Sequence, residues 1–134
     1  MSGPLRYLEN PEIAPRELGD LFKSSGINRP LDDQQRLRKM LQHANLVIGA
    51  YCDDELVGVA RALTDFSYCC YLSDLAVAVQ FQHQGIGEEL VRRVRERIGD
   101  QSMLLLLSAP EAMEYYPKIG FEQIQNAFVI RRSR

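Results

Sequence analysis

The 134-residue sequence has no tryptophan, only two histidines and three cysteines, and no marked excess of charge. The cysteine count is odd and Cys69 and Cys70 are adjacent, so the spacing predicts neither a disulfide framework nor a metal site. The net charge of −2 argues against a nucleic-acid partner. No apolar run approaches the ~20 residues that span a bilayer, and no secretory leader is visible. We therefore expect a protein without a membrane partner, in the cytoplasm, where thiols stay reduced.

The composition is that of one globular domain. Hydrophobic residues make up 46% and charged residues 25% of the chain, both ordinary values. The length allows a hydrophobic core without disulfides or metals. Repeats, low-complexity segments and linkers are missing, so we predict a single domain over residues 1–134.

The hydrophobic pattern changes period several times and predicts a mixed α/β domain. An antiparallel meander is followed by one parallel crossover. The strands are expected at residues 5–8, 46–51, 55–63, 68–79 and 103–107, with one or two more within 121–130. The helices are expected at residues 15–24, from Asp32 or Asp33 to 44, at 87–98 and at 110–116.

Residues 74–94 are the most informative stretch. An apolar strand enters a polar turn, and the turn leads through Gly85-Ile86-Gly87 into an amphipathic helix. Glycines allow close approach of a ligand to the backbone, and the free N–H groups of a helix start attract phosphate. A dinucleotide fingerprint would need glycine where Leu90 stands, and the Gly-Lys-Ser/Thr of a P-loop is absent.

Two motifs together resemble the GCN5-related N-acetyltransferase (GNAT) superfamily. The first comprises residues 74–77 and 82–87 and continues to Leu90; it is similar to the family's acetyl-CoA motif. The second is Tyr115-Tyr116-Pro117-Lys118-Ile119-Gly120-Phe121, similar to the family's Phe-Tyr-x-Lys-x-Gly-Phe segment. The resemblance implies the GNAT fold, a mixed, mostly antiparallel sheet flanked by helices with a parallel crossover at the cofactor cleft.

The resemblance also implies acetyl-CoA as the acetyl donor. The turn would bind its pyrophosphate, and the preceding strand would contact its pantetheine arm. Ser108 would replace a family asparagine that is Ala109 here. The expected cofactor-binding residues are Leu75, Ala76, Val77, Val79, Gln82, His83, Gln84, Gly85, Ile86, Gly87 and Ser108.

For the chemistry, Tyr116 occupies the family's tyrosine position and would protonate the leaving thiolate. Asp74 is our candidate for the general base, acting through water, with Asp65 as an alternative. Arg61 is either a ligand for an anionic group of the substrate or an exposed strand residue.

These features predict an enzyme that transfers an acetyl group to a primary amine by direct transfer in a ternary complex. The acceptor is open between a small metabolite, an aminoglycoside-like sugar and a protein amino terminus, and we favour a small molecule. The alternative is a non-catalytic CoA-binding module with a regulatory or sensor role. A homodimer is expected to form through an edge strand at residues 121–130.

Overall fold

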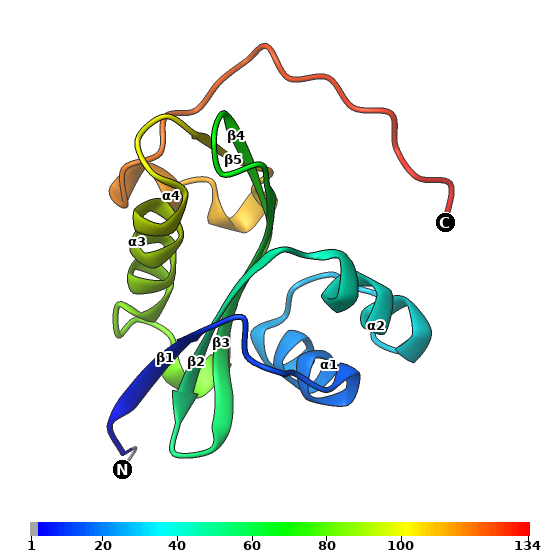
Figure 1. Cartoon of the computed structure of the whole chain (residues 1–134). Coiled ribbons are helices and arrows are strands. Elements are labelled where there is room, and N and C mark those ends of the chain that lie inside the picture. The colour runs from blue at the N-terminus through cyan, green and yellow to red at the C-terminus, as the bar shows by residue number, and fades with distance from the viewer. Residues whose placement is uncertain (1–2) are drawn as a thin grey trace.

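The computed structural model describes residues 3–134 (Figure 1). The strands are β1 (Leu5–Glu9), β2 (Leu46–Cys52), β3 (Glu55–Thr64), β4 (Cys69–Val77) and β5 (Met103–Leu106). The helices are α1 (Pro15–Ser25), α2 (Gln34–His43), α3 (Ile86–Ile98) and α4 (Tyr115–Lys118), with 3₁₀ turns η1 (Val79–Phe81) and η2 (Pro110–Ala112). Among the described helices, none has the length and apolarity to cross a bilayer.

The five strands form one sheet in the order β1-β2-β3-β4-β5. Each pair is antiparallel except β4 and β5, which run parallel. Helices α1 and α2 lie on one side of the sheet and α3 on the other (Figure 1). This arrangement confirms the predicted fold class, a mostly antiparallel α/β sheet with one parallel crossover.

Burial explains why the sheet and α3 pack as they do. All seven residues of β2 are buried, as expected for a strand covered on both faces. On α3 the buried residues Leu90, Val94 and Ile98 recur at helical spacing and face the sheet. The helix starts after Gly85 and stops at Gly99, both with positive φ. The strand-to-helix transition predicted from the sequence is therefore present.

Two expectations for the C-terminal part were wrong. The helix predicted at residues 110–116 is divided into η2 and α4, and Pro117 lies inside α4. Proline fits there because the first turn of a helix needs no intrahelical acceptor for its N–H. Residues 121–130 contain no strand, because the chain beyond Phe121 runs away from the body and does not lie along an edge of the sheet (Figure 1).

Candidate functional site

The central feature of the site is a gap between β4 and β5. Their pairing covers only Cys69–Leu72 against Met103–Leu106. Strand β4 continues to Val77, paired on its other side with β3. From Ser73 onward, one edge of β4 therefore has no strand beside it within residues 3–134. The parallel pair separates into two arms that leave backbone groups available to an extended ligand.

Strand alternation decides which groups face this gap. The N–H of Ala78 donates to the carbonyl of Val57 on β3 at 2.8 Å. Backbone groups alternate between the two sides along a strand, so Ala76 also points toward β3. Leu75 and Val77 then point toward the open side. Of the neighbouring N–H groups of Ala76 and Val77, only that of Val77 is therefore placed to polarise a carbonyl group in the gap.

The turn after β4 is held by its own side chains. Gln82 donates from Nε2 to the carbonyl of Val77 at 2.9 Å, and Val79 donates its N–H to Ser24 Oγ at 3.0 Å. His83 has φ 65°, and Gly85 adopts the left-handed conformation with φ 83°. The side chain of Gln82 therefore braces the turn, and the N–H of Val79 already has an acceptor on α1.

Helix α3 begins directly after this turn with no side-chain cap among the described residues. Its first N–H groups have no acceptor within the helix, and the helix dipole adds about half a positive charge there. A side chain at Gly85 would meet nothing within 4 Å, so the turn is open on that side. Ile86 is buried in the core and anchors the helix start. The turn and the start of α3 are therefore suited to bind a pyrophosphate.

Tyr115 lies over the same helix start. A Cβ added at Gly87 would come within 2.6 Å of its hydroxyl oxygen. Glycine at this position thus leaves room for a phenol directly above the turn. This contact is not visible in the sequence, because it depends on how α4 docks against α3.

Tyr116 is half-buried on α4. Its ring makes edge contacts with Tyr115 and Phe121, at centroid separations of 5.3 and 5.5 Å. Burial raises the pKa of the Tyr116 phenol, Tyr115 raises it further, and the charge of Arg29 opposes both effects. The phenol is therefore protonated at neutral pH, as a general acid must be.

Ser108 follows the end of β5, at the mouth of the gap. Its hydroxyl donates to the carbonyl of Ala109 at 2.7 Å. The expected cofactor-binding residues therefore occupy two arms of one site, with β4 and its turn on one side and Ser108 on the other.

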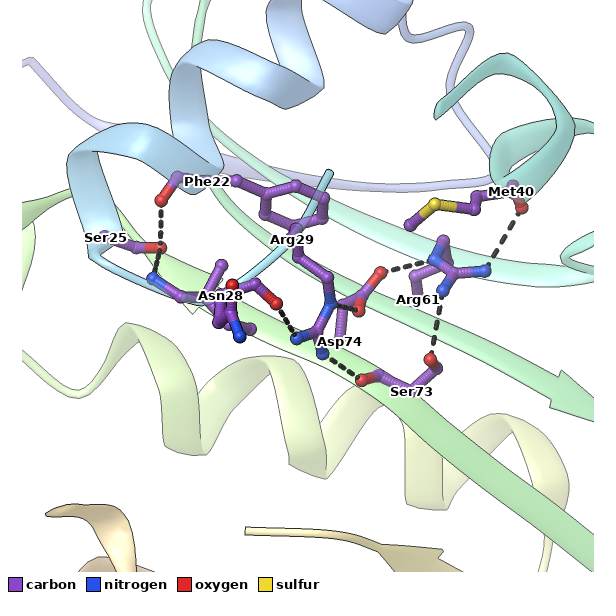
Figure 2. A network of polar contacts seen from close by, with 9 residues as sticks. Phe22, Ser25, Asn28, Arg29, Met40, Arg61, Ser73 and Asp74 are labelled. Atoms are coloured by element: carbon purple, nitrogen blue, oxygen red, sulfur yellow. Dashed lines mark hydrogen bonds and ion pairs between the residues drawn. The ribbon is translucent and has the colours of Figure 1, made fainter. Parts of the chain in front are cut away.

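Asp74 lies in a buried network with two arginines from distant parts of the chain (Figure 2). Arg29, from the loop between α1 and α2, donates from Nε to Oδ1 of Asp74 at 2.6 Å and from Nη2 to the carbonyl of Ser73 at 2.7 Å. Arg61, on β3, donates from Nε to Oδ2 of Asp74. It also reaches the carbonyl of Met40 at 3.2 Å and the hydroxyl of Ser73 at 3.0 Å.

This network changes the interpretation of both residues. Arg61 is 7% exposed and donates one hydrogen bond from each guanidinium nitrogen, so the expectation of an exposed strand residue was wrong. Its alternative role as a ligand for a substrate anion stays a prediction, which these bonds disfavour. Asp74 is 1% exposed, and each of its oxygens accepts from an arginine. Its role as general base stays a prediction, but its surroundings favour an anchor that ties the α1–α2 loop to the sheet. The sequence held no signal for the partner Arg29.

Asp65, the alternative base, forms the turn between β3 and β4. Its Oδ1 accepts from the N–H groups of Ser67, Tyr68 and Cys69 at 2.7–3.0 Å. These bonds, that from Cys69 first and then those from Tyr68 and Ser67, lower the pKa of the carboxyl to about 2. Asp65 therefore stabilises a turn and is a weak proton acceptor.

Comparison with known proteins agrees with this geometry. A family model described as the acetyltransferase (GNAT) domain matches residues 22–132. The uncharacterized N-acetyltransferase ycf52 of Porphyra purpurea is 29% identical over 125 residues, covering 86% of this chain and 69% of that protein.

Two solved structures share the fold. A probable acetyltransferase from meticillin-resistant Staphylococcus aureus superposes with a TM-score of 0.82 at 18% identity, covering 96% of this chain and all of that one (100%). The aminoglycoside N-acetyltransferase AAC(6')-Iy, solved in complex with CoA, superposes with a TM-score of 0.72 at 17% identity, covering 100% and 98%. The family match includes the diverging strands, the glycine turn and Tyr116, and the chain belongs to the GNAT family of acetyltransferases.

Proposed function

We propose that this acetyltransferase moves the acetyl group of acetyl-CoA onto a primary amine of a small molecule, by direct transfer in a ternary complex. The observation that carries the proposal is the gap between β4 and β5, which leads to the uncapped start of α3. The aminoglycoside N-acetyltransferase of similar fold supports a small amine as acceptor.

In this proposal, the N–H groups of residues 82–87 bind the pyrophosphate. The open-side groups of Leu75 hold the pantetheine arm, as a neighbouring strand would, and Val77 offers its N–H at the thioester, since its carbonyl accepts from Gln82. Val79 contributes through its position at the start of η1, directly after β4, since its N–H is bound to Ser24. Ser108 lines the opposite arm.

Acetyl-CoA supplies the activated thioester. The acceptor attacks as the neutral amine, and the N–H of Val77 stabilises the oxyanion that forms at the carbonyl. Tyr116 donates its proton to the departing thiolate, and the proton lost from the amine nitrogen returns through water to the Tyr116 phenolate. The role proposed for Asp74 is to hold Arg29 at the base of the gap rather than to take the amine's proton. A covalent enzyme intermediate is not part of this route, because Cys52 and Cys70 are buried and the exposed Cys69 lies at the β3–β4 turn, with its thiol against Asp65.

The proposal includes a homodimer and a cytoplasmic setting. All three cysteines are unpaired, which suits a reducing compartment.

The test is calorimetric titration with acetyl-CoA followed by release of free CoA across a panel of amines that includes aminoglycosides. Tyr116→Phe is expected to bind acetyl-CoA as the parent does, while kcat falls roughly a hundredfold or more. Tyr68→Phe is the matched control, because this phenol is 77% exposed. Binding of acetyl-CoA without turnover of any amine would point instead to a sensor module. Equal kcat in Tyr116→Phe and the parent would remove the tyrosine from the mechanism.

A further inference from the structure

Two side chains from one short segment bind the open edge of β4 at its two ends. The segment runs from the last turn of α1 into the α1–α2 loop and contains Ser24 and Arg29. Ser24 Oγ accepts from the N–H of Val79 at 3.0 Å. Arg29 Nη2 donates to the carbonyl of Ser73 at 2.7 Å (Figure 2). These contacts bracket the stretch of β4 that has no strand beside it within residues 3–134.

Both contacted backbone groups face the open side of this edge. The N–H of Ala78 points toward β3, and alternation along the regularly paired strand turns the N–H of Asp74 toward β3 as well. The C=O and N–H of one planar trans peptide point in opposite directions, so the carbonyl of Ser73 faces the open side. Because Ala78 is still extended, with φ −55° and ψ 142°, the N–H of Val79 faces away from β3 too.

A third side chain takes one more group of the edge, since Gln82 Nε2 donates to the carbonyl of Val77. The groups that remain without a side-chain partner among the described residues are the N–H and C=O of Leu75 and the N–H of Val77. The pantetheine arm has amide and carbonyl groups along its length, and on this edge it meets only these partners. The occupied groups on either side leave it one hydrogen-bonding register.

Arg29 is itself fixed in place. Its Nε donates to Oδ1 of Asp74 at 2.6 Å, and its Nη1 donates to the carbonyl of Asn28 at 2.7 Å. A planar guanidinium with all three nitrogens engaged has a single orientation. Because Asp74 also binds Arg61 on β3, this end of the edge is connected to the centre of the sheet. An edge that is held in its binding conformation loses less entropy when a ligand pairs with it.

We propose that Arg29 and Ser24 are positioning residues for acetyl-CoA. They occupy the backbone groups at the two ends of the open edge and leave the pantetheine arm a single register, at Leu75 and Val77. The inference rests on the proposed function and gives the segment between α1 and α2 a role in placing the acetyl donor. In this register the thioester carbonyl lies at the N–H of Val77, and the thiolate leaves toward Tyr116.

The first test compares acetyl-CoA with ADP in calorimetric titrations, since ADP carries a pyrophosphate but no pantetheine arm. Arg29→Met is expected to weaken acetyl-CoA binding roughly tenfold and Ser24→Ala roughly fivefold, whereas both variants should bind ADP as the parent does. Arg29→Lys should recover little of the loss, because one ammonium does not reproduce the planar fork of donors.

Two matched controls accompany these variants. Arg16→Met removes an exposed arginine of α1, and Ser25→Ala removes a hydroxyl that donates to a carbonyl of its own helix. Both should bind the two ligands as the parent does. Ser24→Ala removes a single hydroxyl at a partly buried position, so it keeps the test decisive if Arg29→Met is too unstable to titrate.

The second test reads the register from the amide NMR shifts that acetyl-CoA causes and ADP does not. In the parent these should include the N–H groups of Leu75 and Val77 but not that of Val79, which keeps its bond to Ser24. In Ser24→Ala, the N–H of Val79 should join the set, because it is then available to the arm.

The outcomes separate this inference from the proposed function. An equal loss of affinity for acetyl-CoA and ADP would mean that the substitutions merely disturb the turn, and would overturn the inference. A parent that prefers acetyl-CoA, together with variants that bind it equally well, would overturn the inference alone. A parent that binds acetyl-CoA no more tightly than ADP would overturn the proposed function and the inference with it.

Discussion

Replacing Asp74 by alanine separates an anchoring role from a catalytic one. The substitution leaves the guanidinium of Arg61, whose side chain is 8% exposed, without its carboxylate. Removing one partner of a buried ion pair costs about 3–5 kcal/mol, because the other charge stays buried. The loss of the Arg29 ion pair adds little to this destabilisation, since the Arg29 side chain is 26% exposed and can turn toward water. Unfolding free energies of domains are about 5–15 kcal/mol, so Asp74→Ala removes a large part of the total.

The assay is chemical and thermal unfolding of Asp74→Ala, Arg29→Ala and the double variant. At this chain length, roughly 4 °C of Tm accompanies each kcal/mol, so we expect Asp74→Ala to lose about 12–20 °C. Arg29→Ala should lose much less, because Asp74 keeps Arg61 neutralised. The double variant should be less destabilised than the sum of the two, because both residues belong to one network.

The reasoning fails if Asp74→Ala unfolds within about 1 kcal/mol of the parent, which is the usual effect of a surface substitution. If such a stable variant also loses kcat and the acidic limb of its pH–rate profile, Asp74 is the general base after all. Asp74→Asn, which preserves shape but removes the charge, should lie between the parent and Asp74→Ala in stability.

Two further predictions concern the turns. Gly85→Ala should lower the free energy of unfolding by about 1 kcal/mol, because alanine is strained at φ 83°. Gly87→Ala should leave stability nearly unchanged but weaken acetyl-CoA binding about fivefold, because its Cβ displaces Tyr115. Thermal melts measure the stabilities and calorimetry measures the binding, and equal effects of the two alanines would contradict this account. The Asp65 pKa of about 2 lies below the ordinary 3.8, so its contribution to stability is complete above about pH 4 and is lost as the pH falls toward 2. Asp65→Asn should therefore flatten the stability curve between pH 4 and 2, and an unchanged slope in denaturant titrations would contradict the assignment.

The sequence by itself determined the local parts of the site. The strand into Val77, the turn through Gln82 and Gly85 and the helix after it are set by neighbouring residues, so their pattern is legible in order along the chain. The position of Tyr116 follows from a motif of the same kind. Local backbone preference and hydrophobic period act over a few residues, and a linear reading captures them.

Only the tertiary structure decided the surroundings of Asp74. Arg29 lies 45 residues before it and Arg61 lies 13 residues before it, and the sheet and the α1–α2 loop bring all three together. A linear pattern does not show whether a carboxylate meets water or two guanidiniums, because that depends on packing between distant segments. The placement of Tyr115 above Gly87 was hidden for the same reason.

Residues 121–130 illustrate the same division. Their apolar and aromatic side chains led to the expectation of a strand, which was wrong, because a strand exists only where a sheet edge lies alongside it. Whether Phe128 and Ile130 pair with a sheet edge depends on where β5 ends and on the direction in which the chain leaves α4. Composition and period determine what a segment is able to form, and through-space hydrogen bonding and burial decide what it does form.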